Sequence, residues 1–525
     1  MKERESKRVL FLVTELQRPV GGLHRFTTEL LPVWMNRFNR GETLFEPLVF
    51  SIRDQDLPLG DLKPSERFNE LAKKNGVKIY EAKRGGVLCF FVESELSTEE
   101  RNALHYGLWA KYGVKSEKSS NWPFYKKLNA YWKTMPAIAE QLAKKENITV
   151  IDAQDWLAFP AGFLCRERIG KPLVCRFHSG EWGRSMGHPD LDDAPVRIEA
   201  AALQEADFVV GVSVSEAKFE IRKLLPLKQE TRNQLFEDLC NSVGEEKAKK
   251  WFEEQLWKEE KYEEFLLLEP EEEFISITHA AGGVPNGIIL EDWRKMSVEK
   301  IKFGRVVLQK LLPDKKKYVM FIGRPDARKG MDQLINAFAQ LEMDNAGLIL
   351  SSSLSNGESI KYNRMLEELG LKKNAIIYSG WLEEDLKKSL FCSIDVLAIP
   401  SLYEPFGLVT LEGLAADLAC EVNDLPGPAV VVGDTGGMGE VIKNGINGFK
   451  VQVTDFTLKP EDLAKVLKIV LTNDRLRKKV AKGGAESIIS NNFDWNSLVF
   501  RLFEIYTGAS ENYGFWRENS DLVIV

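Results

Sequence analysis

Short apolar runs alternate with longer amphipathic segments along most of the chain. "RVLFLVTEL" near the N-terminus predicts a buried strand, and "GGLHRFTTELLPVWMNRF" repeats apolar residues such as Leu23, Phe26 and Leu30 near helical spacing. Further strands are predicted at "FEPLVFSI", "VKIYEA", "ITVIDAQD", "KPLVCRFHS" and "ADFVVGVSVS", with helices over residues 123–145 and 160–169. Strand and helix in alternation predict a parallel sheet with crossover helices.

The same rhythm restarts after the turn sequence "VPNG" at residues 284–287. "KKYVMFIG", "AGLILSSS", "NAIIYSG", "SIDVLAIPS" and "PAVVVGD" predict strands, and "KGMDQLINAFAQLE", "LVTLEGLAA" and "PEDLAKVLKIVLTN" predict helices. The fold class we predict is therefore α/β, with two tandem Rossmann-like doubly wound domains. The predicted domains are 1–284 and 285–500, and residues 501–525 are expected to cross back to the first domain.

One segment breaks this rhythm. Residues 228–273 are charged and helix-prone, with aromatic residues interleaved, and predict a helical insertion into the first domain. The insertion is either a solvated helical pair packed on that domain or a surface for oligomerisation or substrate. Residues 420–429 are predicted to lengthen a loop of the second domain.

Composition excludes several classes of protein. The 525 residues carry a net charge of −7, which argues against general binding to nucleic acid. No run reaches the eighteen apolar residues that a membrane span needs. The six cysteines are scattered without a C-x-x-C pair, so neither a zinc site nor a disulfide framework is indicated. Buried, reduced thiols and a cytoplasmic location are expected.

Glycine and basic residues follow two predicted strands, at the sheet edge where doubly wound domains bind ligands. Gly21 and Gly22 open the first helix, which suits either close approach of backbone amides to a phosphate or sugar, or a structural tight turn. Arg324 and Lys329 flank the loop after "KYVMFIG". Two cations beside a helix N-terminus suit a diphosphate, and the alternative is two solvated side chains.

The stretch "SLYEPFGLVTLEG" carries two carboxylates. Glu412 lies within the first turns of a predicted helix, where a carboxylate is favourable in any case. Glu404 precedes Pro405 and Gly407 in the loop, which suits an acceptor of hydroxyl groups better than a helix cap. The T-G-G sequence at residues 435–437 follows another strand and offers further backbone amides.

Two strand ends of the first domain also carry polar side chains. Asp155 follows "ITVIDAQ", and His178 follows "KPLVCRF". A neutral histidine there either donates to a sugar hydroxyl or orients a leaving group, or is a satisfied structural residue. Asp54 and Asp56 form a D-x-D pattern, which is common in polar loops, and we predict no metal site.

Together these segments resemble the retaining nucleotide-sugar glycosyltransferases of the two-Rossmann-domain (GT-B) type, specifically family 4 and the related glycogen and starch synthases of family 5. "EPFGLVTLE" is similar to the E-x7-E motif of family 4, "GRPDARKG" to its phosphate loop, "VGGL" to its N-terminal glycine loop and "VPNGI" to its hinge. The resemblance covers most of the chain except the insertion and residues 53–125. Pro19 stands where glycogen synthases usually carry a lysine, which favours family 4 more broadly.

The resemblance implies a role for each of these positions. Arg324 and Lys329 are expected to neutralise the donor diphosphate, and Glu404 to contact the donor sugar. Glu412 is expected at the ribose and His178 at the sugar pocket. The remaining implied contacts are Asp155 on the acceptor side and, at the donor, Gly21, Gly22, Phe406, Gly407, Leu408, Thr435, Gly436, Gly437 and Trp381.

The implied activity is retaining transfer of a hexose, with glucose as the first candidate, from a nucleotide sugar to an acceptor hydroxyl. An α-glucan is one candidate acceptor and a small molecule or lipid is another, although no basic amphipathic helix favours a lipid. Neither cofactor nor metal is expected. Epimerisation of a sugar nucleotide on the same fold stays open, whereas the intact set of charged motif residues disfavours a non-catalytic binder. These residues do not identify the donor base or sugar.

Overall fold

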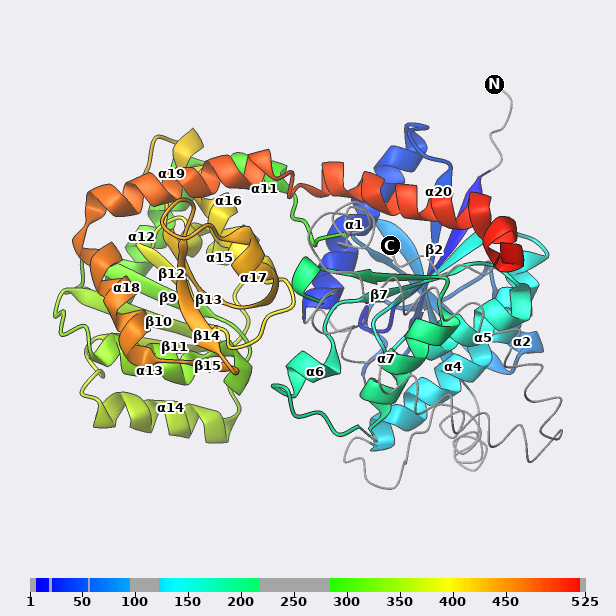
Figure 1. The fold of residues 1–525 in the computed structure, drawn as a ribbon, viewed down its shortest axis with the longest axis horizontal. Coiled ribbons are helices and arrows are strands. Elements are labelled where there is room, and N and C mark those ends of the chain that lie inside the picture. The colour runs from blue at the N-terminus through cyan, green and yellow to red at the C-terminus, as the bar shows by residue number, and fades with distance from the viewer. Residues whose placement is uncertain are drawn as a thin grey trace. The chain divides into compact units, whose positions relative to one another are not determined.

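The computed structural model describes residues 6–17, 21–54, 57–94, 122–191, 193–216 and 284–519. The chain folds as two compact units, shown in Figure 1. The first unit comprises residues 1–285 together with 499–525, and the second comprises 286–498. The predicted insertion over residues 228–273, with its expected role in oligomerisation, lies outside the described residues, as does Pro19.

The first unit contains an eight-stranded sheet in the order β3-β4-β5-β2-β1-β6-β7-β8. Its strands are β1 (Lys7–Leu12), β2 (Phe45–Ile52), β3 (Lys63–Pro64), β4 (Val77–Arg84), β5 (Val87–Ser94), β6 (Ile148–Gln154), β7 (Leu173–Phe177) and β8 (Phe208–Gly211). Its helices are α1 (Gly22–Asn39), α2 (Asn69–Lys74), α4 (Trp122–Ala143), α5 (Phe159–Ile169), α6 (Glu181–Arg184), α7 (Ala194–Glu205) and most of α20 (Trp495–Asn519). Each strand and helix predicted over the described residues of this unit is present, with ends shifted by a few residues.

Both faces of the central strands of this sheet are buried, which explains why these strands are almost continuously apolar. Successive side chains of a strand point to opposite faces. On β1, Leu10 and Leu12 join the core that contains Trp132 of α4. The intervening Phe11 packs edge-on against Trp34 of α1. Trp34 also stacks on Tyr506 of α20, and Figure 1 shows α20 running beside α1 along this unit.

The prediction of a purely parallel sheet is wrong at one end of the first unit. β4 pairs antiparallel with β5, and β3 pairs antiparallel with β4. Only Gly85 and Gly86 connect β4 to β5, and both have positive φ (55° and 82°). A two-residue connection of this kind makes a hairpin, because a parallel pair needs a crossover of a dozen or more residues.

The second unit contains a seven-stranded sheet in the order β11-β10-β9-β12-β13-β14-β15, with helices on both sides of it in Figure 1. Its strands are β9 (Lys317–Ile322), β10 (Ala346–Ser352), β11 (Ala375–Ser379), β12 (Val396–Ile399), β13 (Ala429–Asp434), β14 (Phe449–Thr454) and β15 (Thr457–Leu458). Its helices are α11 (Leu290–Arg294), α12 (Val298–Leu311), α13 (Met331–Ala339), α14 (Asn356–Glu368), α15 (Glu384–Phe391), α16 (Leu408–Val422), α17 (Gly436–Val441), α18 (Pro460–Thr472) and α19 (Asp474–Ser490). In this sheet order, the six strands from β11 through β9 to β14 pair parallel with their neighbours, and β15 pairs antiparallel with β14.

The prediction of a long loop over residues 420–429 is wrong in its extent. Helix α16 continues to Val422, so the connection to β13 comprises only residues 423–428. Asn423 stops the helix and donates from its side-chain amide to the carbonyl of Met296. Residues 420–422 therefore extend α16, which packs against α19, and only residues 423–428 form the loop.

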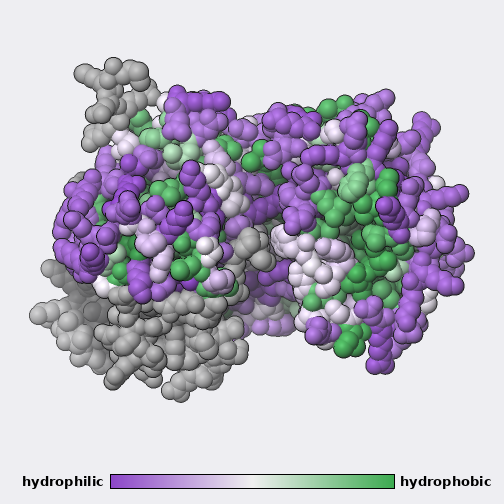
Figure 2. Space-filling view, turned by 180° about the vertical axis from the view of Figure 1, so that it is seen from behind, coloured by the Kyte–Doolittle hydropathy of each residue, from purple (hydrophilic) through white to green (hydrophobic). Residues whose placement is uncertain are grey.

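Apolar side chains are visible on the face of the second unit seen in Figure 2. Helix α12 contributes exposed apolar residues to the surface of this unit, with Phe303, Val306 and Leu311 each about half exposed. Its buried residues, Ile301 and Leu308, recur at helical spacing. The helix is thus amphipathic, and it packs against α15.

The described cysteines, Cys89, Cys165, Cys175, Cys392 and Cys420, are all buried and free. The prediction of buried thiols is confirmed for these five. Among the described residues, no helix combines the length and the apolar character needed to cross a membrane.

Candidate active site

The predicted donor residues lie at the point where the second sheet changes its winding direction. From β9 the chain proceeds to β10 and β11 on one side, and then returns to place β12 and β13 on the other. The loops that follow β9 and β12 therefore lie side by side at the carboxyl ends of these neighbouring strands. Ligands of doubly wound sheets bind at such a switch point.

A lysine and a glutamate meet across this switch point. Lys329 follows β9, Glu404 follows β12, and the Lys329 ammonium forms an ion pair with Glu404 Oε2. Both side chains are about one-fifth exposed (20% and 17%), so the pair is accessible but partly shielded from water. An ammonium has three donors, so one bond to Glu404 leaves two for oxygen atoms of a ligand.

Backbone contacts fix the loops that follow β9, β12 and β13 against one another. The Leu402 amide donates to the Arg328 carbonyl at 2.7 Å, and the Gly437 amide donates to the Pro405 carbonyl at 3.0 Å. A methyl group on Gly330 would lie 2.0 Å from the Pro400 carbonyl oxygen, and one on Gly436 would lie 1.9 Å from that of Glu404. Glycine is therefore required at both positions by close backbone approach.

Two helices begin at this point without a side-chain cap. Helix α13 starts after Gly330 and α16 starts after Gly407, both of which have positive φ (70° and 86°). The free N–H groups and the positive end of a helix dipole favour an anion. Of the sequence-predicted residues, Phe406 and Leu408 flank Gly407 at the second of these starts, whereas Thr435 precedes α17. Phe406 is buried and packs on Phe493, so its backbone rather than its ring faces this region.

The loop after β9 carries two further basic residues, Arg324 and Arg328, which differ in exposure and in their ion pairs. Arg324 is exposed and forms no ion pair with a described residue. Arg328 is bound by Asp326, whose carboxylate accepts from Nε at 2.9 and 3.0 Å. Burial favours the neutral form of Asp326, yet the hydrogen bonds and charge of Arg328 lower its pKa to about 2. Arg328 is therefore held by its own loop, and Arg324 is the available guanidinium.

Glu412 is less accessible than the sequence suggested. Its side chain is 2% exposed, and its Oε1 accepts from the Lys387 ammonium at 2.9 Å. Lys387 also pairs with Glu384 at 2.8 Å. Sequence analysis missed Lys387, because a lysine on an amphipathic helix carries no signal that it reaches an acidic residue on another helix.

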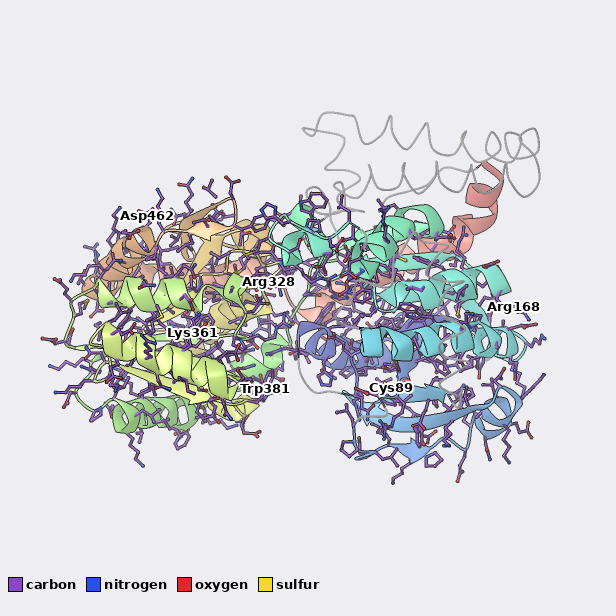
Figure 3. The ribbon with its side chains drawn as sticks, turned by 90° about the horizontal axis from the view of Figure 1, so that it is seen from below. Cys89, Arg168, Arg328, Lys361, Trp381 and Asp462 are labelled. Atoms are coloured by element: carbon purple, nitrogen blue, oxygen red, sulfur yellow. The ribbon has the colours of Figure 1, made fainter. Side chains whose placement is uncertain are left out.

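An aromatic pair follows β11 at the edge of the second sheet. Trp381 is 62% exposed and Tyr378 is 42% exposed, and the Tyr378 hydroxyl donates to the Trp381 carbonyl at 3.5 Å. Figure 3 labels Trp381 and Arg328 at the same end of the second unit, away from Asp462. An exposed indole at this end can stack on a planar group.

The first unit has its own switch point, between β1 and β6. Gly21 and Gly22 follow β1, and Gly21 adopts a φ of 101°, which glycine favours. Phe26, one turn into α1, packs on the His178 ring with the centroids 4.6 Å apart. The structure therefore brings the glycine loop and His178 to the same edge of this sheet.

Asp155 lies at the end of β6 in a charged cluster. Its φ of 64° is unusual for a residue other than glycine. Arg184 lies 3.7 Å from Asp155, 2.8 Å from Glu181 and 2.7 Å from Glu199. Burial raises the pKa of Asp155, and the Arg184 charge opposes this effect. Sequence analysis did not identify Arg184, whose guanidinium lies between Asp155 and the buried Glu199.

Among the described residues, no group of three His, Cys, Asp or Glu side chains is arranged to hold a metal ion. Asp54 of the D-x-D pattern is described, whereas Gln55 and Asp56 lie outside the described residues.

Comparisons with known proteins identify the second unit. Residues 307–487 match the family model "Glycosyl transferases group 1". An uncharacterised glycosyltransferase of Methanocaldococcus jannaschii is 27% identical over 386 residues, which cover 72% of this chain and 81% of that protein. A D-inositol 3-phosphate glycosyltransferase of Salinispora arenicola is 24% identical over 378 residues, 70% of each chain. A glycogen synthase of Mycobacterium tuberculosis is 26% identical over 195 residues, 36% of this chain and 42% of that enzyme.

Solved structures support the architecture of the whole chain. Sucrose-phosphate synthase from Thermosynechococcus elongatus superposes with a TM-score of 0.58 at 16% identity, covering 95% of this chain and 98% of that one. HepE of Anabaena, solved with UDP and glucose, superposes with a TM-score of 0.55 at 16% identity, covering 96% and 100%. The chain therefore has the GT-B fold, and residues 307–487 within its second unit are similar to the group 1 glycosyltransferases.

Proposed function

We propose that the protein transfers a hexose from a nucleotide sugar to an acceptor hydroxyl with retention of anomeric configuration. The observation that carries this proposal is the Lys329–Glu404 pair at the β9/β12 switch point, beside two uncapped helix starts. A cation and free N–H groups suit a diphosphate, and a carboxylate suits the hydroxyls of a sugar. The named relatives are transferases and synthases, so we propose transfer rather than epimerisation.

In the proposed reaction, Lys329 and Arg324 stabilise the charge that develops on the departing diphosphate. The bond between the anomeric carbon and the phosphate oxygen breaks, and the acceptor oxygen bonds to the same face of the sugar. The acceptor proton passes to the departing phosphate oxygen, so the protein supplies no separate base. Glu404 orients the sugar, and Glu412, held by Lys387, is our candidate for the ribose hydroxyls.

Two classes of acceptor are candidates, an α-glucan and a small molecule. The glycogen synthase match covers less than half of that enzyme, whereas the match to the D-inositol 3-phosphate glycosyltransferase covers 70% of both chains. This difference in coverage favours a small-molecule acceptor over an α-glucan as the first to test. The buried free thiols support action in a reducing compartment such as the cytoplasm.

A donor panel tests the proposed function. ADP-, UDP- and GDP-linked glucose and mannose are each incubated with the full chain, and nucleotide release is measured with a glucan, with inositol phosphate and without acceptor. UDP-glucose is a rational first donor, because HepE was solved with UDP and glucose. Acceptor-dependent release with one donor supports transfer. Product in which the anomeric configuration is inverted would refute retention, and conversion of the donor without an acceptor would indicate another reaction.

A further inference from the structure

A buried chain of polar side chains runs from helix α20 to His178 in the first unit. The Tyr506 hydroxyl donates to Asp152 Oδ2, and Gln154 Nε2 donates to Asp152 Oδ1 at 2.5 Å. Gln154 Oε1 lies 2.9 Å from His178 Nε2. Tyr506 and Gln154 have no exposed surface and Asp152 is 1% exposed, so solvent does not compete for these bonds.

The direction of every hydrogen bond in this chain follows from one carboxylate. Burial raises the pKa of Asp152 to about 6, while Tyr506, Arg176 and Gln154 oppose the shift, so the group is mainly ionised above neutrality. An ionised carboxylate can only accept. The NH₂ group of Gln154 must therefore face Asp152, and its carbonyl oxygen must face His178. That oxygen also only accepts, so His178 Nε2 must carry a proton.

The protonation of the second ring nitrogen of His178, Nδ1, then depends on the charge of the ring. Burial and the positive charge of Arg176 hold the pKa of His178 well below its usual value, so the ring is neutral at pH 7. A neutral ring with a proton on Nε2 has a lone pair on Nδ1. The hydrogen bond of the His178 ring within the described residues is made by Nε2, to Gln154, and not by Nδ1.

We propose that Asp152 and Gln154 are positioning residues that fix His178 as the Nε2–H tautomer, so that Nδ1 accepts a hydrogen bond from a hydroxyl of the bound sugar. The identity of the ligand rests on the proposed function, whereas the tautomer rests on the network alone. His178 is therefore an acceptor at this site, not the donor that the sequence analysis considered.

The network also reaches both places where the chain enters or leaves the first unit. Arg176 donates to the carbonyl of Val284, just before the border at residues 285 and 286. Tyr506 lies on α20 shortly after the chain re-enters this unit at residue 499. Arg176 also covers Phe26, with its guanidinium carbon 4.5 Å from the ring centroid, and Phe26 packs on His178. The orientation of His178 is thus tied to the two connecting segments.

The tautomer can be measured directly in the full chain. Protein labelled with ¹⁵N-histidine is studied by long-range ¹H–¹⁵N correlation at pH 7.5, and His178→Gln identifies the signal among the five histidines. We expect protonated Nε2 and unprotonated Nδ1. A proton on Nδ1, or a doubly protonated ring, would overturn the proposal whether or not any sugar is transferred.

Two variants test the positioning role. In Asp152→Asn the side chain can both donate and accept, so Gln154 is no longer fixed and we expect a mixture of tautomers and roughly tenfold lower kcat/KM. If that variant does not fold, Gln154→Leu removes the oxygen that accepts from His178 Nε2 and should likewise give a mixture of tautomers, and Tyr131→Phe is the control. The Tyr131 hydroxyl is also buried but makes only a 3.4 Å bond to the Phe50 carbonyl, outside the network. An unchanged Nε2–H signal in a folded Asp152→Asn or Gln154→Leu protein would show that the network does not set the tautomer.

Discussion

Lys329 and Glu404, the two charged side chains that meet in the candidate site, are largely buried, which is uncommon for these residue types. Each is about four-fifths buried and each neutralises the other. A bound diphosphate would draw on the remaining donors of Lys329, and the Glu404 carboxylate keeps the ammonium in position. A partly buried charge acts more strongly than one in bulk water, because the effective dielectric constant is lower.

Replacement of Lys329 by alanine tests its role in stabilising the leaving group. We expect kcat/KM for transfer to fall by roughly 10²-fold or more, since the developing phosphate charge loses a close cation. Lys361→Ala is the control. Lys361 lies on α14, its side chain is 54% exposed, and it forms an ion pair with Asp332 of α13 at 2.7 Å. Steady-state kinetics with the preferred donor measures both, and a near-normal rate for Lys329→Ala would remove the phosphate role.

The neutral state of His178 predicts a pH dependence of stability. The pKa of His178 is held well below 6.5 in the folded protein by burial and by Arg176. As the pH falls below 6.5, the unfolded chain binds a proton that the folded chain excludes, so stability decreases with a slope approaching about 1.4 kcal/mol per pH unit. His178→Gln should lack this loss.

Urea unfolding of both proteins at pH 7.5 and 5.5 measures this difference. Asp152 titrates in the same range with the opposite sign, because its raised pKa favours the folded state as the pH falls. That contribution is common to both proteins and cancels in the comparison. Equal losses of stability in the two proteins would contradict a neutral, buried His178.

At the scale of elements, the candidate site depends on how closely three loops approach. The loops after β9, β12 and β13 are joined by two backbone hydrogen bonds and by glycines that replace side chains at contact points. Because the strands beneath them are adjacent in the sheet, the sheet sets the loop positions and glycine permits the final contact. A larger side chain at these glycines would therefore be expected to disturb the site, as would the loss of the charge at Lys329.

Gly330→Ala tests this requirement against a matched control. Gly330 and Gly445 have similar positive φ values, 70° and 74°, but only Gly330 faces a close neighbour, the Pro400 carbonyl. Alanine at Gly445 should cost about 1–2 kcal/mol for left-handed backbone alone. At Gly330 overpacking should add about 1–3 kcal/mol. Urea unfolding compares the two, and equal costs would show that the contact with Pro400 is unimportant.

At the scale of the whole molecule, the chain leaves the first unit after Pro285 and returns to it at Val499. Helix α20 thus begins in one unit and contributes to the core of the other. Phe503 and Tyr506 of this helix pack on Trp34 of α1. The C-terminal residues are therefore needed to complete the first unit, although they are far from it in the sequence.

Phe503→Ala should destabilise the first unit selectively. Phe503 is 6% exposed, and truncation of a buried phenylalanine costs about 3–5 kcal/mol. Phe500→Ala on the same helix is the control, because Phe500 is 36% exposed and should cost less. Hydrogen exchange should accelerate in β1 and β6 but not in β9 and β12. Equal acceleration in both sheets would show that the units do not unfold separately.

Removal of divalent cations tests the expectation that no metal is needed. Charge on the departing diphosphate would be neutralised by Lys329 and Arg324, so transfer should persist in excess EDTA. Nucleotide release measured before and after chelation is the readout. Loss of activity that returns on addition of magnesium or manganese would contradict the proposed mechanism.

The sequence predicted the candidate site unevenly. It singled out Lys329, Glu404 and the glycines of the loops, because they directly follow apolar strands, at the edge where doubly wound sheets bind ligands. It did not identify Lys387, Arg184 or the Asp152–Gln154 pair. Their partners lie on other elements, up to 354 residues away for Asp152 and Tyr506. Side chains that meet only through the packing of elements leave no local signal.

The sequence by itself determined the alternation of strands and helices, the restart after residue 287 and the positions of the loops that form the candidate site, because periodicity and turn chemistry are local. The tertiary structure decided the antiparallel edge of the first sheet, the pairing of Lys329 with Glu404, the burial of Glu412 and the network that orients His178. These features depend on which elements become neighbours, and that choice is made by the packing of the whole core rather than by any one segment.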